Sequence, residues 1–153
     1  MRKLFSLFAT AGLLAGCGDS TGPGSAQAFR NCAEVGSMNV GGDLSGSLTT
    51  SDCVLQDVVI FGIPFGGSFV DYHEFGISSA QSIAITMSST QFDTVLLLFN
   101  RASGDLVDFD DDSGDGGVGT NSRIEMTLPA GTYVIGATSF DEGETGTYQL
   151  AVN

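Results

Sequence analysis

Residues 82–100 read SIAITMSSTQFDTVLLLFN, and this stretch decides the fold class. Ile83, Ile85 and Met87 alternate with small or polar residues, which is the period-two pattern of a strand buried on one face. Residues 95–99, VLLLF, are apolar at every position, as expected of a central strand or of one that a loop covers on its second face. We therefore expect two successive strands here, the second of them buried on both sides.

The chain from residue 42 onward continues in the same way. Short apolar and β-branched runs are separated by Gly, Asn, Asp and Ser about every ten residues, and no segment shows a sustained helical period. This pattern predicts an all-β fold, a single antiparallel β-sandwich of jelly-roll type with about eight or nine strands. The expected strands are residues 43–48, 57–61, 69–77, 82–88, 94–100, 106–109, 123–128, 132–138 and 147–152.

The N-terminus reads MRKLFSLFATAGLLAGC, in which two basic residues precede a short apolar run. This is the pattern of a secretory signal peptide. Residues 14–17 resemble the bacterial lipobox, which implies cleavage after residue 16, a lipid on Cys17 and anchoring in the bacterial cell envelope. Gly18 favours the outer membrane, with the periplasmic or surface face left open. The alternative is an ordinary signal peptide with a stray cysteine.

These boundaries divide the chain into a signal peptide at 1–16, a Gly- and Ser-rich flexible linker at 17–31 and a sandwich domain at 32–153. The full chain has a net charge of −13, and the cleaved chain has three arginines against 18 acids, a net of −15. This charge argues against nucleic acid and anionic lipid surfaces as partners, and it favours cations or basic protein surfaces. In an exported domain, Cys32 and Cys53 are expected to form a disulfide. The alternative, a metal site or a catalytic thiol, lacks nearby His or further Cys ligands.

Residues 108–119 read DFDDDSGDGGVG, and their aspartates must either lie open in water or surround a cation. Carboxylates converging with loop carbonyls suit Ca²⁺, although the EF-hand pattern fails at Ser113 and Gly119. The candidate calcium ligands are Asp108, Asp110, Asp111, Asp112 and Asp115. The second interpretation is a solvated loop, stabilised by Arg123 and by hydrogen bonds from local Asn and Ser side chains to the backbone.

Residues 60–69, IFGIPFGGSF, place three aromatic side chains among glycines. Phe61, Phe65 and Phe69 are candidates for contact with a protein or polysaccharide ligand through an aromatic hairpin, because exposed apolar patches usually mark contacts. Alternatively, these side chains close the open end of the sandwich core.

Enzyme chemistry has little support in the sequence. His73 is the only histidine, and it lies in an expected strand. No Ser or free Cys lies in a sequence motif that would make it a nucleophile. The acids cluster in one exposed loop, where nothing obvious would raise the pKa of one carboxyl above that of its partner, as a pair of catalytic carboxyls requires. We therefore expect no enzyme, and an exported hydrolase is only a third hypothesis.

Six segments in order resemble the bacterial pre-peptidase C-terminal domain, a β-sandwich of exported proteins. They are GDLSGSLTTSDC (42–53), DYHEFGI (71–77), SIAITMSSTQFDTVLLLFN (82–100), SGDLVDFDDDSG (103–114), NSRIEMTLPAGTYVIGATSF (121–140) and GTYQLAV (146–152). The resemblance implies a β-sandwich, and since some family members bind calcium it also favours the calcium interpretation. We expect a non-catalytic, lipid-anchored binding or accessory module, with a structural or assembly lipoprotein acting through the aromatic hairpin as the alternative.

Overall fold

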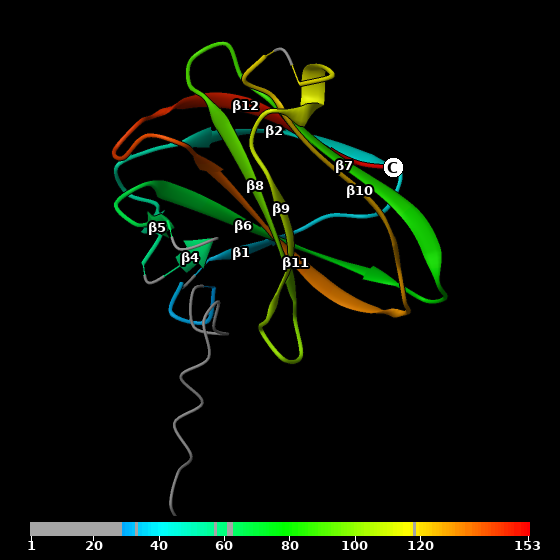
Figure 1. Cartoon of the computed structure of the whole chain (residues 1–153). Helices are drawn as coiled ribbons and strands as arrows, with labels where there is room; N and C mark the ends of the chain where they lie inside the picture. The colour runs from blue at the N-terminus through cyan, green and yellow to red at the C-terminus, as the bar shows by residue number, and fades with distance from the viewer. Residues whose placement is uncertain (1–28, 33, 57, 61–62, 118) are drawn as a thin grey trace, which may run out of the picture.

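The computed structural model describes residues 29–153 apart from 33, 57, 61, 62 and 118, and two main β-sheets packed face to face form its body (Figure 1). The six-stranded sheet holds β1 (Val35–Ser37), β3 (Cys53–Val54), β6 (Phe69–Ile77), β8 (Thr94–Asn100), β9 (Leu106–Asp110) and β11 (Gly131–Ser139). The four-stranded sheet holds β2 (Gly42–Leu48), β7 (Gln81–Ser88), β10 (Ser122–Leu128) and β12 (Gly146–Val152). The predicted all-β sandwich is confirmed.

The strand order is β1-β6-β11-β8-β9 in the larger sheet, with β3 on β6, and β10-β7-β12-β2 in the smaller one. All pairings are antiparallel except that of β1 with β6. A separate hairpin joins β4 (Val58–Ile60) to β5 (Ile63–Phe65), and a 3₁₀ turn, η1 (Ser113–Asp115), lies between β9 and β10. The nine predicted strands correspond to elements of the structure, whereas β1, β3 and β5 were not predicted.

Apolar side chains form two layers, one on each face of β8. Leu96 and Leu98 face the core between the sheets, together with Ile83, Ile85 and Met87 of β7. Val95, Leu97 and Phe99 belong to a second cluster, which includes Val70, Tyr72 and Val134. All five residues from 95 to 99 have zero exposure, so the predicted double burial of VLLLF is confirmed.

Phe29 covers the outer cluster, although it lies inside the predicted linker. Its side chain is 2% exposed, and its ring centroid lies 5.7 Å from that of Phe99 and 6.2 Å from that of Tyr72. The Arg101 guanidinium stands 5.3 Å above the Phe29 ring, and its Nε is 2.7 Å from Glu74 Oε2. The folded domain therefore includes Phe29, whose ring packs on the outer face of β8.

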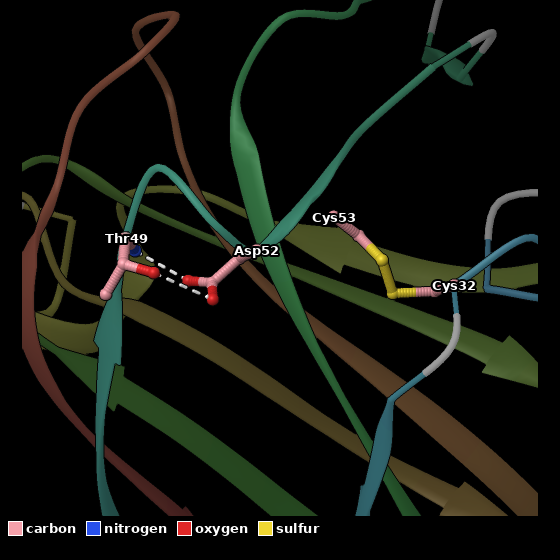
Figure 2. The surroundings of a disulfide bond; sticks show 4 residues. All are labelled: Cys32, Thr49, Asp52 and Cys53. Carbon is pink, nitrogen blue, oxygen red and sulfur yellow. Dashed lines mark hydrogen bonds between the residues drawn. A yellow bond between two sulfur atoms is a disulfide. The ribbon is translucent and has the colours of Figure 1, made fainter.

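A disulfide fixes this N-terminal cover to the larger sheet. Cys32 and Cys53 are bonded, with Cα atoms 5.8 Å apart, as predicted from the sequence (Figure 2). Cys53 lies in β3, which pairs with β6 through the partners Cys53 and Val70. On the loop-entropy model, closing this 22-residue loop stabilises the fold by about 3 kcal/mol.

Tyr148 packs on the smaller sheet over a glycine. It lies directly opposite Gly46 in the β12–β2 ladder and is 2% exposed. A Cβ atom added to Gly46 would overlap the Tyr148 ring. The absence of a side chain at Gly46 therefore makes room for the Tyr148 ring, and a larger residue there would require the ring to move.

Replacing Gly46 by Ala should lower the free energy of unfolding by about 1–3 kcal/mol, because the Tyr148 ring would have to move. Gly76→Ala is the matched control, since Gly76 also lies in a strand and an added Cβ there meets nothing within 4 Å. Urea unfolding of both variants measures the difference. Equal effects of the two substitutions would contradict this packing.

Candidate functional site

A chain of three polar side chains crosses the interior from one sheet to the other. The Tyr148 hydroxyl of β12 donates to Oδ2 of Asp71 on β6 at 2.7 Å, and His73 Nε2 lies 3.0 Å from the same hydroxyl oxygen. Because the hydroxyl has one proton, which it gives to Asp71, His73 donates from Nε2 to the Tyr148 oxygen. The only histidine of the chain is therefore part of an inter-sheet link.

Burial dominates the electrostatics of this link. Desolvation lowers the pKa of His73 below its ordinary value, and desolvation also raises the pKa of Tyr148, with Asp71 adding to the rise. The pKa of Asp71 is raised chiefly by burial, against the hydrogen bond from Tyr148, and further by the nearby charges of Asp52 and Glu34. A neutral imidazole and a protonated phenol result at neutral pH, as a structural link requires.

Asp71 also borders an acidic hollow of about 300 Å³ beside the disulfide. Its lining residues are Cys32, Glu34, Ser51, Asp52, Cys53, Val70 and Asp71. Asp52 accepts hydrogen bonds from the Thr49 backbone N–H at 2.6 Å and from the Thr49 hydroxyl at 2.9 Å, so its carboxylate closes the turn after β2 (Figure 2). The sequence did not indicate that these three acids converge.

Asp110 joins the two sheets at the acidic loop. Its Oδ2 accepts hydrogen bonds from the backbone N–H of Arg123 at 2.7 Å and of Ser113 at 3.1 Å, and its Oδ1 accepts one from the Ser113 hydroxyl at 2.7 Å. Asp110 ends β9 in the larger sheet, whereas Arg123 lies in β10 of the smaller one. Asp110 thus links the end of β9 to β10 across the corner where the two sheets meet, and we call it the corner residue.

Among the other predicted calcium ligands, Asp108 and Asp115 each accept a hydrogen bond from a different part of the loop. The chain leaves the strand after Asp110 and turns into η1, so Asp112 does not continue the strand face of Asp108. Asp108 Oδ1 accepts from the Phe109 N–H at 2.9 Å, and Asp115 Oδ2 accepts from the Asn121 amide at 2.6 Å. The Asp111 carbonyl accepts from the Ser122 hydroxyl at 3.2 Å. Within the described residues, no group of three or more His, Cys, Asp or Glu side chains is arranged to hold a metal ion.

The side chains of the three arginines that the structure describes make contacts outside the acidic loop. The Arg123 guanidinium pairs with Glu125 at 2.8 Å, so only its backbone contributes to the loop. Arg30 donates to the Ala102 carbonyl at 3.1 Å, and Arg101 binds Glu74.

Asp93 is a further acid at this end of the sandwich, and the sequence did not single it out as a ligand. Burial raises its pKa, and so do the neighbouring charges of Asp112, Asp111, Asp141 and Glu144. Asp93 Oδ1 and Glu144 Oε2 are shielded from solvent and have no hydrogen-bond partner among the residues that the structure describes. Acidic loops far apart in the sequence therefore meet here, which only the fold could reveal.

The aromatic segment forms the β4–β5 hairpin, with Val58 paired to Phe65 and Ile60 to Ile63. Phe61 lies outside the described residues, as does Cys17. Phe69 begins β6, where it is half-buried and packs against the core between the sheets. The described part of the chain contains no helix that is long and apolar enough to cross a membrane.

Comparison with protein families agrees with this architecture over β6 to β11. Residues 69–139 match the bacterial pre-peptidase C-terminal domain family. The pre-peptidase C-terminal domain of a collagenase from Bacillus anthracis is similar in structure, with a TM-score of 0.56 and 17% identity over 78% of this chain and 95% of that one. The resemblance noted in the sequence is confirmed over this segment.

A second similar structure is PliG from Aeromonas hydrophila, a periplasmic lysozyme inhibitor of g-type lysozyme. Its TM-score is 0.52 with 15% identity, over 78% of this chain and 96% of that one. At these identities the likeness concerns the fold alone. No curated protein matches the chain.

Replacing Asp110 by Ala should lower the free energy of unfolding by about 1–3 kcal/mol, because two backbone N–H groups would lose their acceptor. Asp112→Ala is the matched control, since it removes the same charge from an exposed side chain that makes no capping hydrogen bond to η1. Chemical unfolding at neutral pH compares the two. Equal losses would show that Asp110 is not the corner we describe.

His73 should make the domain less stable as the pH falls. Because its folded pKa is below the ordinary 6.5, the unfolded chain binds the proton more tightly, and stability decreases from about pH 6.5 down to the folded pKa. Asp71, with a raised pKa, changes stability in the opposite sense at lower pH, above its ordinary 3.8. His73→Gln should flatten the decrease that begins below about pH 6.5. A variant as pH-dependent as the parent would refute this assignment.

Proposed function

We propose that this chain is a non-catalytic binding or accessory module of the bacterial cell envelope, anchored by a lipid on Cys17. The main support for this proposal is the match of residues 69–139 to the pre-peptidase C-terminal domain family, which fits a non-catalytic accessory module. The engagement of His73 in an inter-sheet link supports the same conclusion. The acidic charge of the chain favours a basic or neutral ligand over nucleic acid.

Fatty-acid labelling of the full-length chain tests the anchor. The parent chain, produced in a Gram-negative host with an alkynyl fatty acid, should become labelled and sediment with membranes, because a diacylated cysteine holds a protein at a bilayer. Cys17→Ser should abolish both the label and the sedimentation. An unlabelled parent chain would exclude the anchor. Hydrolysis by the purified parent chain on a panel of glycans and peptides would exclude the non-catalytic role.

The aromatic hairpin is the second candidate, acting in a structural or assembly lipoprotein. The observation that favours it is that, among the strands that the structure describes, β4 and β5 form a two-stranded sheet of their own outside both main sheets. Loss of partner capture in Phe65→Ser with unchanged stability would support contact through the hairpin. Loss of folding would instead place Phe65 in the core.

Calcium binding by the loop of residues 108–115 stays a prediction. It draws support from the charges of Asp111 and Asp112 near Asp93, but Asp110 and Asp115 already accept hydrogen bonds within the protein. If calcium orders the loop, excess Ca²⁺ should raise the melting temperature by several degrees over EGTA, because a ligand of the folded state stabilises it. Identical melts would leave the solvated loop as the interpretation.

A further inference from the structure

The four-stranded sheet has a gap at one end. The last residue of β7, Ser88, pairs with Gln149 of β12. β12 extends three residues beyond this pair, to Gly146, and over that stretch it pairs with β2 but not with β7. On the other side of β7, Asn121 directly precedes β10. These strand ends enclose an open hollow of about 390 Å³, which we call the hydroxyl hollow. It is lined by Ser88, Ser89, Thr90, Asn121, Thr147 and Gln149, together with Tyr148.

Side chains replace the missing strand pairing and make the walls of the hollow rigid. The Ser89 hydroxyl donates to the Thr147 carbonyl at 2.9 Å, and the Gln91 side-chain oxygen accepts from the Thr147 backbone N–H and hydroxyl. Asn121 is held on both sides, since its amide oxygen accepts from the Ser89 N–H and its amide nitrogen donates to Asp115. The walls are thus pre-organised for a ligand.

Polar groups remain available on these rigid walls. Ser88, Thr90 and Gln149 are exposed. Within the described part of the chain, the hydroxyls of Ser88 and Thr90 make no hydrogen bond. The Gln149 amide is oriented by a 3.0 Å hydrogen bond from Ser45 to its oxygen, which leaves the amide nitrogen to donate outward. Hydroxyls both donate and accept, so the hollow offers both kinds of group within a small space.

The chemistry of the lining selects the class of ligand. None of its residues is charged, although the chain carries 18 acids. A cation would be attracted to the carboxylates elsewhere, an anion would be repelled by the net charge, and an apolar ligand would leave the lining polar groups without partners. The volume falls within the range of small-molecule sites, about 300–1,000 Å³.

We propose that the hydroxyl hollow binds a neutral sugar unit of a polysaccharide. The sugar hydroxyls exchange hydrogen bonds with Ser88, Thr90 and Gln149, while the hollow's open shape lets the glycan chain continue on either side. This inference rests on the proposed binding role and specifies its ligand. It requires neither the anchor nor a metal ion.

Nuclear magnetic resonance of the full-length, ¹⁵N-labelled chain tests the proposal with maltotriose, cellotriose and chitotriose as probes. At least one of these should shift the backbone amide signals of Ser88, Thr90 and Gln149 in a saturable way. The double variant Thr90→Val with Gln149→Ala should bind that sugar at least tenfold more weakly. The matched control is Thr127→Val with Gln81→Ala, which makes the same changes at exposed positions at the opposite end of the sheet and should bind as the parent does.

Three outcomes would overturn the proposal: no shifts with any of the three sugars, shifts confined to other residues, or equal binding by both double variants. The same spectra report whether each variant is folded, so a loss of binding is not confused with a loss of structure. If the sugars fail while Cys17 is labelled and the chain sediments with membranes, this inference falls and the proposed module stands. If sugar binding is found on an unlabelled chain, the inference stands and the anchor falls.

Discussion

The burial of β8 on both faces is the constraint on which the rest of the structure depends. A strand of five successive apolar residues must be covered twice, and the second sheet can cover only one side. The outer side is closed by Phe29 and residues such as Leu55 and Val58. The disulfide and the Arg101 contact with Phe29 hold that cover in place. A two-layer sandwich has thereby become a three-layer arrangement around one strand.

Much of the fold could be predicted because its longer strands have a clear period. β6 and β8 have the predicted bounds, and the other long strands differ by one or two residues. β1, β3 and β5 have only two or three residues, which is too few to show any period. They are defined by their pairings, and the attachment of β3 to β6 beside Cys53 could not be derived from composition. The small and polar neighbours of Phe29 in the sequence predict a linker there and give no sign of its burial.

The candidate sites were harder to predict because they depend on residues distant in the chain. The aspartate run from 108 to 112 was visible, but its division into the corner residue Asp110 and the exposed Asp112 follows from the turn into η1. The link between His73 and Tyr148 spans 75 positions. The hydroxyl hollow consists of common polar residues that have no motif, and only the early end of β7 brings them together.

The position of the disulfide has a mechanical consequence. Tension that enters the domain from the N-terminal side reaches Cys32, and the covalent bond to Cys53 passes it directly into β3 and its neighbour β6. The chain between the two cysteines, which includes β1 and the edge strand β2, lies off this load path. β2 could otherwise be peeled from β12 one residue at a time, because it lies at the edge of its sheet. The cross-link therefore directs force that enters at Cys32 toward β6, which has neighbours on both sides, and bypasses the edge strand.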